Sequence, residues 1–363
     1  MDKIIVVGAG ISGLLSALEL SEAGYEVSIL DQSDFGRESS WAGGGIISPL
    51  YPWEYPEAIN QLAALSQHYY PTLVKRLYEA TDIDPEYRES GMLFLDQDED
   101  GPGYRWAQTQ AQLRYQLLDG AALHAAEPGL KTALPHALLF ENRAQVRNPR
   151  LLKAVIQVLK NKNVKLLSRS SVEQVLVRHN EVRGVKTNQG EILAPHVLIC
   201  AGAWSGQSGL FEQAKTIYPV QGQMLLYRIA ANTLRHVILD QGRYIIPRAD
   251  GRVLVGSTME PRGFDKQITQ QAFKALNEFA CSHFPVLENQ LETHWAGLRP
   301  ATDDHLPVIG PHPSIHGLYI NAGHFRNGVV MAPASARLIL NIIAKQPTIL
   351  DPTAFAPRLK KQN

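Results

Sequence analysis

Glycines at fixed spacing near the N-terminus form the first pattern in this sequence that indicates a binding site. They stand in the segment GAGISG, directly after the β-branched run KIIVV at 3–7. Gly8 allows a tight turn, Gly10 lets a pyrophosphate approach a helix N-terminus, and Gly13 lets that helix pack closely on the strand. Apolar residues then recur at helical spacing until Gly24. The pattern predicts a dinucleotide-binding turn built by Gly8, Gly10, Ile11, Ser12 and Gly13.

An acidic residue follows the second predicted strand. The run EVSIL at 26–30 ends at Asp31, whose carboxylate is placed to accept the hydroxyls of a ribose. An acid at this position disfavours NADP, whose 2′-phosphate is accommodated by an arginine. The order of strand, glycine turn, helix, strand and acid therefore predicts a bound dinucleotide other than NADP.

The segment after Asp31 indicates whether the expected cofactor is FAD or NAD. An NAD enzyme would continue into another βαβ unit, whereas residues 32–48 read as a loop rich in glycine and serine. Three consecutive glycines at 43–45 offer bare backbone, on which the isoalloxazine ring of an extended FAD can lie. A flexible lid is the alternative interpretation of the same loop. The residues expected to contact the cofactor here are Gln32, Glu38, Ser39, Ser40, Gly43, Gly44 and Gly45.

Later segments supply further expected elements of the same site. The buried run 197–200 enters the small-residue turn AGAWS, which gives a second close backbone approach to the nucleotide. Val172 falls where its backbone can hold an adenine edge. Asn148 precedes Pro149 and is expected to cap the helix that begins there. The predicted contacts from this part of the chain are Val172, Ala201, Gly202 and Trp204.

Composition excludes several classes of function. Lys+Arg and Asp+Glu both number 35, so the chain has no net charge that would favour nucleic acid or an anionic membrane. No apolar run approaches the length of a membrane-spanning helix, and no secretory signal is evident. The two cysteines, Cys200 and Cys281, are far apart in apolar sequence and are expected to be reduced thiols of a cytoplasmic protein. The histidines at 305, 312 and 316 lack the carboxylate pattern of a metal site, so we expect no metal.

The chain is expected to form an α/β fold with two interleaved domains. A Rossmann-like FAD-binding domain is assigned to 1–85, 144–214 and 295–363. A substrate-binding domain of α+β type, built on an antiparallel sheet, is assigned to 86–143 and 215–294, because the segments around GRYIIPRADGRVLVG read as alternating strands joined by turns.

Several stretches together resemble the D-amino-acid oxidase family of FAD enzymes, in particular its glycine oxidases. The resemblance covers essentially the whole chain in order and is carried by the motifs RESSWAGGGIISPLYPW, VRNPRL, AGAWSG, GRYIIPR, VGSTME, HWAGLRP and GHFRNGVVMAP. It implies a non-covalent FAD, dioxygen as co-substrate, and oxidative deamination of glycine, sarcosine and small D-amino acids. It further implies a link to thiazole synthesis for thiamine and a homodimer or homotetramer.

The resemblance also assigns substrate residues. Arg299, in GLRP, matches the family's carboxylate-binding arginine, and a planar guanidinium suits a carboxylate because it binds in a bidentate fork. Tyr244, in GRYIIP, matches a tyrosine that donates to the same carboxylate. Arg326, in HFRNG, matches a second position on the substrate side. Met259 is expected in the pocket wall, with core packing as the alternative.

The helix after HFRNG is expected to face the flavin. A helix N-terminus carries partial positive charge and free N–H groups, which would stabilise negative charge on the reduced ring. The cofactor contacts predicted from this segment are His324, Phe325, Arg326, Asn327, Gly328, Val329 and Val330.

Two questions stay open from the sequence. A D-amino-acid dehydrogenase that passes electrons to a quinone is the alternative activity, since access of oxygen depends on cavity shape. The preferred amino acid is also open, although Tyr51, Trp53 and Tyr55 are expected to crowd the entrance and favour small substrates.

Overall fold

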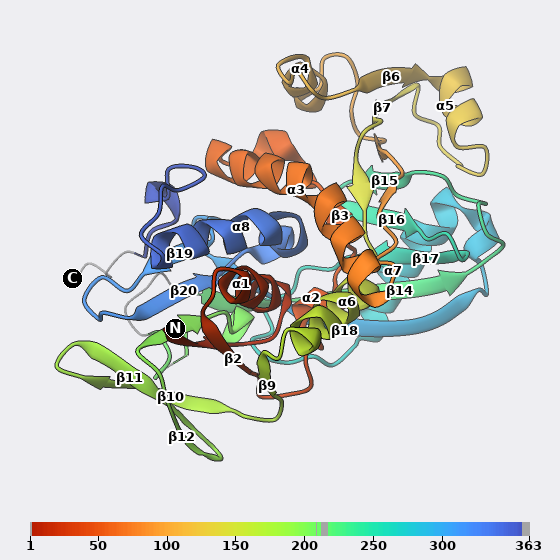
Figure 1. Cartoon of the computed structure of the whole chain (residues 1–363). Coiled ribbons are helices and arrows are strands. Elements are labelled where there is room, and N and C mark those ends of the chain that lie inside the picture. Colours follow the sequence, from red (N-terminus) through yellow and green to blue (C-terminus); the bar gives the residue numbers. More distant parts are fainter. Residues whose placement is uncertain (1, 208, 212–216, 358–363) are drawn as a thin grey trace, which may run out of the picture.

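Two large sheets organise the chain, which a computed structural model describes over residues 2–207, 209–211 and 217–357 (Figure 1). The first sheet has six strands in the order β19-β20-β13-β1-β2-β9. Neighbouring strands are parallel except β19, which is antiparallel to β20. The strands are β1 (Lys3–Val7), β2 (Glu26–Leu30), β9 (Lys165–Leu167), β13 (His196–Ile199), β19 (Val308–Pro311) and β20 (Leu318–Ala322). This is the parallel sheet expected for the nucleotide domain.

Both faces of this sheet are covered, which explains why β1 is a continuous apolar run. Ile4 and Val6 face one side and pack in the same core as the helices, whereas Ile5 and Val7 face the other. Helices α1 and α8 contact each other on the first side, and α3 and α6 pack beside them (Figure 1). These helices are α1 (Ile11–Glu22), α3 (Glu57–Thr81), α6 (Asn148–Asn161) and α8 (Gly328–Ile343).

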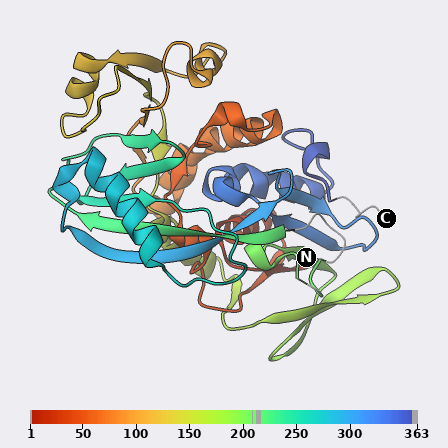
Figure 2. The ribbon, with the colours of Figure 1, turned by 180° about the vertical axis from the view of Figure 1, so that it is seen from behind.

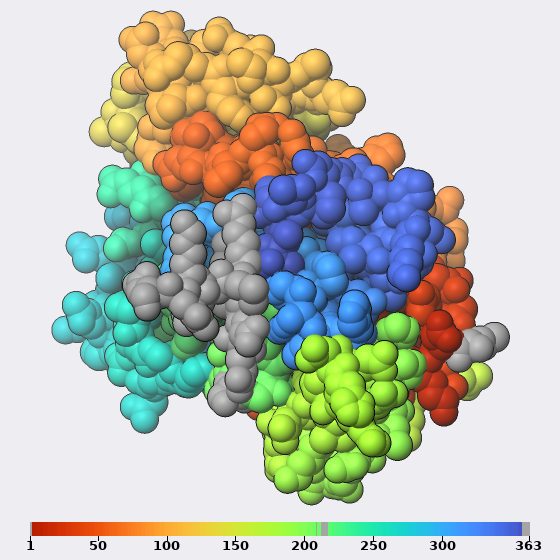
Figure 3. Space-filling view, turned by 90° about the vertical axis from the view of Figure 1, so that its left-hand side faces the viewer, coloured from red at the N-terminus to blue at the C-terminus, as the bar shows by residue number. Residues whose placement is uncertain are grey.

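A three-stranded meander packs against the other side of the parallel sheet. Val175, Val182 and Val185 of the meander share a buried cluster with Ile5 and Val7. The meander extends away from the body of the molecule and forms the lobe at the bottom of Figure 3. Its strands are β10 (Val172–Arg178), β11 (Glu181–Thr187) and β12 (Gly190–Leu193).

The second large sheet has eight strands in the order β18-β14-β17-β16-β15-β5-β7-β6. All its pairs are antiparallel except β15 with β5, which is parallel. The turn expected between two strands at 249–251 is confirmed between β16 and β17. The strands are β5 (Met92–Phe94), β6 (Tyr115–Asp119), β7 (His136–Phe140), β14 (Ile217–Arg228), β15 (Val237–Asp240), β16 (Arg243–Pro247), β17 (Arg252–Gly256) and β18 (Leu291–Thr302).

The second sheet presents different chemistry on its two faces because side chains alternate along a strand. Ile245 of β16 packs with Leu276 and Phe279 of α7, the helix that crosses the sheet in the view from behind (Figure 2). Its neighbours Tyr244 and Ile246 face the opposite side, where they join a cluster rich in aromatic residues. The helices of this part are α4 (Pro102–Gln108), α5 (Gly120–Ala126) and α7 (Gln270–His283). Together with β6, α4 and α5 form the lobe at the top of Figure 3.

A small sheet lies at the junction of the two large ones. It pairs β3 (Ile46–Ile47) and β4 (Arg88–Glu89) with β8 (Ala144–Gln145). Ser39 and Ser40, expected in a loop, instead begin one helical turn, α2 (Ser39–Ala42). The remaining elements are single 3-10 turns: η1 (Pro52–Glu54), η2 (Gly202–Trp204), η3 (Pro285–Leu287), η4 (Phe325–Asn327) and η5 (Thr353–Phe355).

The fold class expected from the sequence is confirmed, while the domain boundaries given above stay a proposal. β18 begins in the segment assigned to the substrate domain and continues past position 295 as one strand of the antiparallel sheet. Among the described residues no helix is long and apolar enough to cross a membrane.

Candidate active site

A deep cleft lies between the two large sheets and encloses about 1670 Å³ of empty space, including its open mouth. Its floor is formed where the parallel strands β1, β2, β13 and β20 end, through Gly8, Asp31, Ala201 and Gly323. Ligands of open α/β sheets bind at the carboxyl ends of the strands. The opposite wall comes from β14, β16 and β18 of the antiparallel sheet. The cleft therefore has one wall suited to a nucleotide and another able to select a second molecule.

The glycine motif takes the expected shape. Gly8 has a φ of +103°, and a Cβ there would lie 2.4 Å from the Cys200 carbonyl oxygen. A Cβ on Gly13 would lie 2.0 Å from the Gly8 oxygen, so Gly13 permits close packing of α1 on the first turn and does not line the cleft. A Cβ on Gly10 would meet only Ser40 Oγ, at 3.1 Å. Gly10 thus leaves open space beside the N-terminus of α1, where N–H groups are free to bind an anion.

Asp31 is held in place by hydrogen bonds from the backbone. Its Oδ2 accepts a hydrogen bond from Ala9 N at 2.7 Å, and its Oδ1 accepts from Ser33 N at 2.8 Å. A carboxylate has about four lone-pair sites, so it retains capacity for the hydroxyls of a ribose. Asp31 and Gln32 both line the cleft, as predicted.

The three consecutive glycines line the cleft, but the reason for their lack of side chains differs from the prediction. A Cβ on Gly44 would lie 2.5 Å from Ile246 Cδ1, and a Cβ on Gly45 would lie 2.1 Å from the Val146 oxygen. Gly45 also has a φ of +73°. The missing side chains therefore make room for the protein behind the loop, and the loop backbone borders the cleft as a result.

The role of Asn148 also differs from the prediction. It does not cap α6 but is its first residue, with Arg147 at the N-cap position. Its Nδ2 donates to the carbonyl oxygens of Ser40 at 2.8 Å and Gly43 at 2.9 Å. Asn148 thus fixes the glycine loop instead of its own helix.

The cofactor residues expected from the middle of the chain also line the cleft. Trp204 lies there and packs on Phe264, with ring centroids 5.4 Å apart. Phe264 belongs to residues 257–269, which we call the strap. Lys266 of the strap forms an ion pair with Glu38, at 3.0 Å, on the other wall. The predicted residues found in the lining from these segments are Glu38, Ser39, Ser40, Val172, Ala201, Gly202 and Trp204.

The segment before α8 reaches the cleft through most of the predicted residues. His324, Phe325, Arg326, Gly328 and Val329 line it, whereas Asn327 and Val330 are buried outside the lining. Burial lowers the pKa of His324 to about 4, so the imidazole is neutral near neutral pH. Its Nε2 has no hydrogen-bond partner among the described residues.

Arg299 occupies the antiparallel wall, where alternation along β18 turns it towards the cleft. Its Nη2 donates to Ser257 Oγ at 2.5 Å and its Nη1 to the Thr258 carbonyl at 3.1 Å. A Cβ on Gly222 would lie 2.0 Å from Nη1, so the guanidinium lies directly on the backbone of β14. Burial lowers the pKa of Arg299, partly offset by the nearby Tyr244 hydroxyl. No carboxylate of the described residues forms an ion pair with Arg299.

Two further predicted substrate residues lie near Arg299. Tyr244 is buried, lines the cleft, and donates to Met224 Sδ at 3.3 Å. Arg326 donates to the Gly242 carbonyl at 3.0 Å. The interaction of Arg326 with Arg299 also lowers the pKa of Arg299, so the two guanidinium groups create a positive field in this part of the cleft.

Met259 does not belong to the pocket wall. It is 56% exposed and lies outside the cleft lining, because the strap carries it to the surface. Met224, which the sequence analysis missed, takes the position beside Tyr244. The alternation of β14 was the available signal, since Gly222 and Met224 lie two residues apart on the face that meets the cleft.

The comparisons with known proteins agree with this geometry. A family model described as FAD dependent oxidoreductase, DAO, matches residues 3–342. The chain is 43% identical to a glycine oxidase of Pseudomonas aeruginosa, over 98% of both chains. It is 30% identical to the bifunctional protein ThiO/ThiG of Trichormus variabilis, over 94% of this chain and 53% of that protein. The structure of glycine oxidase from Geobacillus kaustophilus matches all of both chains with a TM-score of 0.93 at 26% identity.

The chain belongs to the DAO family of FAD-dependent oxidoreductases. The cleft of this DAO-family protein fits its cofactor on independent grounds. Three buried polar atoms of lining residues have no partner among the described residues: Ser48 Oγ, Asn321 Oδ1 and His324 Nε2. Buried polar groups are normally hydrogen-bonded, so these atoms are suited to a polar ligand. Among the described residues no group of histidine, cysteine and carboxylate side chains is arranged to hold a metal ion.

Proposed function

We propose that this DAO-family oxidoreductase deaminates glycine, sarcosine and small D-amino acids oxidatively. The products are the 2-oxo acid (glyoxylate from glycine), ammonia or an amine, and hydrogen peroxide. The observation that carries the proposal is Arg299, a guanidinium that faces the cleft and whose acceptors in the described part of the chain, Ser257 and Thr258, are neutral. Burying a cation without a counter-ion is unfavourable, and an amino-acid carboxylate supplies the missing charge.

The protein's contribution to the reaction is orientation. Arg299 binds the carboxylate in a fork and Tyr244 donates its hydroxyl to the same group, so the Cα–H bond of the amino acid is fixed in direction. The residues proposed to hold FAD are the cleft-lining residues of the glycine motif, Asp31, the glycine loop and the segment before α8. FAD held there would supply the oxidation of the amino acid to its imine, with dioxygen as the final electron acceptor that yields hydrogen peroxide, and water would hydrolyse the imine.

The three aromatic residues expected at the entrance lie outside the cleft lining. Tyr51 is buried and packs edge-on against Trp53, with ring centroids 5.5 Å apart. Tyr55 lies close enough to Arg299 to influence its pKa. The preference for glycine or another short amino acid is therefore proposed from the glycine oxidases among the relatives.

The wider role is proposed from the relatives and the cysteines. Relatives named ThiO/ThiG join a domain like this chain to a second one, which supports a supply of the glycine-derived imine to thiamine thiazole synthesis. Cys200 and Cys281 are both free thiols, which supports the cytoplasm as the compartment. A homodimer or homotetramer is the proposed assembly.

The proposal is tested by anaerobic addition of glycine, sarcosine and D-alanine to the FAD-loaded protein. We expect the flavin absorbance to bleach and then to recover in air with formation of peroxide. Bleaching without recovery in air would contradict an oxidase and identify a dehydrogenase that uses another acceptor, such as a quinone. Absence of bleaching with all three amino acids would refute the substrate assignment.

A further inference from the structure

The glycine loop at 43–45 is fixed from behind through each of its three carbonyl groups. Asn148 Nδ2 donates to the Gly43 oxygen at 2.9 Å, Arg248 Nη2 donates to the Gly44 oxygen at 2.7 Å, and Val146 N donates to the Gly45 oxygen at 2.8 Å. In a trans peptide the N–H points opposite to the C=O. The N–H groups of the same three peptides are therefore turned away from these donors. The three glycines also line the cleft.

Arg248 is an unusual donor for such a role because it is only 6% exposed. Its Nη1 donates to Gln145 Oε1 at 2.6 Å and to the Val146 carbonyl at 2.8 Å. All three of its acceptors, counting the Gly44 oxygen, are neutral, and its Nε has no partner among the described residues. Burial lowers the pKa of Arg248 to about 10, so the group remains a cation near neutral pH.

The position of Arg248 is itself fixed on both sides. Gln145 is buried and donates to Ser90 Oγ at 2.9 Å and to the Pro247 carbonyl at 3.0 Å. Arg248 N donates to the Arg252 carbonyl at 2.7 Å in the turn between β16 and β17. The guanidinium therefore has little freedom to move away from the glycine loop.

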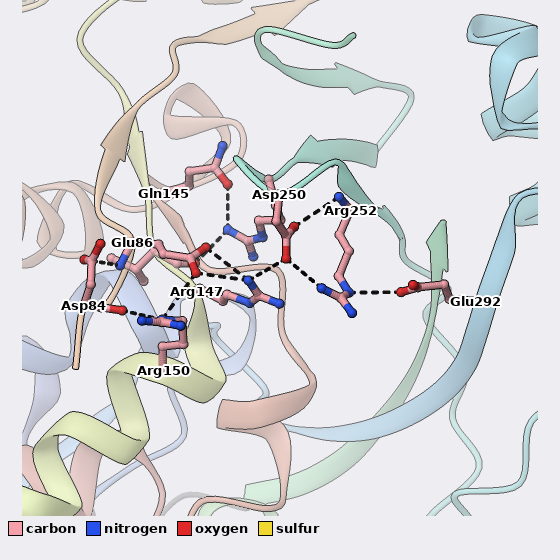
Figure 4. A network of polar contacts seen from close by, with 10 residues as sticks. Asp84, Glu86, Gln145, Arg147, Arg150, Asp250, Arg252 and Glu292 are labelled. Atoms are coloured by element: carbon pink, nitrogen blue, oxygen red, sulfur yellow. Dashed lines mark hydrogen bonds and ion pairs between the residues drawn. The ribbon is translucent and has the colours of Figure 1, made fainter. Parts of the chain in front are cut away.

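A chain of ion pairs, which we call the ladder, lies outside Arg248 (Figure 4). It consists of Glu86, Arg147, Asp250, Arg252 and Glu292, which are far apart in sequence. Arg147 contacts Glu86 at 3.0 Å and Asp250 at 2.9 Å, and Asp250 in turn contacts Arg252 at 2.6 Å. Arg252 continues to Glu292 at 3.0 Å. The carboxylates of Glu86 and Asp250 raise the pKa of Arg248 while Arg147 lowers it. The ladder thus surrounds the buried cation with charges of both signs and leaves its positive charge largely uncompensated by direct contact.

We propose that Arg248 is a positioning residue for the cofactor: it turns the Gly44–Gly45 peptide so that its N–H faces the cleft, and its charge polarises that peptide. A hydrogen bond to a charged donor strengthens the dipole of the accepting peptide, and an electron-rich nitrogen or oxygen atom at the edge of the flavin ring is the acceptor that such an N–H suits. The same field favours negative charge in the cleft and so facilitates reduction of the bound flavin. The inference rests on the FAD-dependent function but does not depend on which amino acid is oxidised.

The test compares Arg248→Gln with Arg252→Gln, a variant in the same turn. Arg252 contacts Asp250 and Glu292 and makes no contact with the glycine loop, so its loss controls for damage to the ladder. The measurements are the dissociation constant of FAD from the apoprotein and the reduction potential of the bound flavin, neither of which needs the amino acid. For Arg248→Gln we expect FAD binding weaker by about tenfold or more, the size expected for hydrogen bonds to a charged group, and a more negative potential. Arg252→Gln should match the unmodified protein in both.

Two further variants keep the test decisive if Arg248→Gln does not fold. Arg248→Lys retains the charge but not the fork, so the potential should be largely restored while FAD binding recovers only in part. Asn148→Ala removes the donor to Gly43 and keeps the cation, so FAD binding should weaken with little change in potential. Equal effects of Arg248→Gln and Arg252→Gln would overturn the proposal, as would a lysine variant whose potential stays as low as that of the glutamine variant.

Discussion

Replacing Arg299 by methionine should separate its contribution to activity from its contribution to stability. The guanidinium gives the cleft its carboxylate-binding charge, yet its hydrogen-bond acceptors among the described residues are neutral groups of Ser257 and Thr258. Removing one partner of a buried, hydrogen-bonded charge pair costs about 2–5 kcal/mol, and about 1.4 kcal/mol corresponds to tenfold. We therefore expect kcat/KM for glycine to fall by roughly 30- to 4,000-fold, mainly through KM.

In contrast to its activity, the stability of the Arg299→Met protein should increase or stay the same. A buried cation without a counter-ion is unfavourable to the fold, and an apolar side chain of similar length avoids that cost. The methyl thioether would lie on Gly222 of the same wall. The melting temperature of the Arg299→Met apoprotein should stay the same or rise by a few degrees, since on the order of 1 kcal/mol corresponds to about 2–4 °C at this size.

The assays combine steady-state kinetics with thermal unfolding in the presence and absence of a small carboxylate such as glycolate. A ligand that binds only the folded state raises its stability, so glycolate should raise the melting temperature of the unmodified protein but not that of Arg299→Met. Arg243→Met is the matched control. Arg243 precedes Tyr244 but lies 5.6 Å from the Phe279 ring on the α7 side of the sheet, so its loss should leave KM unchanged. An Arg299→Met protein that unfolds early but retains its KM would refute the reasoning.

Three other changes have distinct expected outcomes. Gly44→Ala places a Cβ 2.5 Å from the nearest side-chain atom, and such overpacking should destabilise the apoprotein by about 1–3 kcal/mol, measured by denaturant unfolding. Lys266→Glu replaces the ion pair with Glu38 by a repulsion, so FAD should dissociate faster by about two- to fivefold in a stopped-flow fluorescence assay. His283→Gln tests a pH effect: burial lowers the pKa of His283, but the hydrogen bonds to Asp240 and to the Phe279 carbonyl, together with the Asp240 charge, outweigh burial and the pKa is raised. The histidine should therefore stabilise the fold below about pH 6.5 and lose that effect as pH rises through its raised pKa, as seen in melting temperatures.

Each of these three predictions has a result that would contradict it. An alanine at position 44 with unchanged stability would show that the side chains behind the loop adapt freely. An unchanged rate of FAD release from Lys266→Glu would show that the strap does not retain the cofactor. A stability difference between His283→Gln and the unmodified protein that grows towards alkaline pH would contradict the assigned sign.

Local patterns were sufficient to predict the fold of the nucleotide half. The positions of Gly8, Gly13 and Asp31 follow from the chain's own short-range order, because turn, helix and strand are consecutive in sequence. The strand pattern around Tyr244 likewise predicted an antiparallel sheet. Each of these features depends on residues within about 30 positions of one another, as expected of a βαβ unit.

Contacts between distant segments were not predictable in the same way. The sequence indicated that the glycine loop lacks side chains but not that Val146 and Ile246 occupy the space behind it. Arg248 was not singled out, because a lone arginine in a turn is usually solvated and its burial arises only when β16 packs against the glycine loop. Met259 was misplaced because the strap leaves the sheet at Ser257, a change of direction that carries no local sequence signal.

The packing of α8 on α1 has a consequence for how the protein is made. The first helix of the nucleotide unit is far apart in sequence from the helix that covers it, α8, which begins at Gly328. The strand that pairs with β13 in the parallel sheet, β20, is also distant in sequence from β1 and ends at Ala322. During synthesis the apolar face of α1 must therefore be kept out of water by other means until α8 has been made. Such long-range closure slows folding and exposes the unfinished sheet to aggregation, so the yield of active enzyme should depend on chaperones and on the supply of FAD during translation.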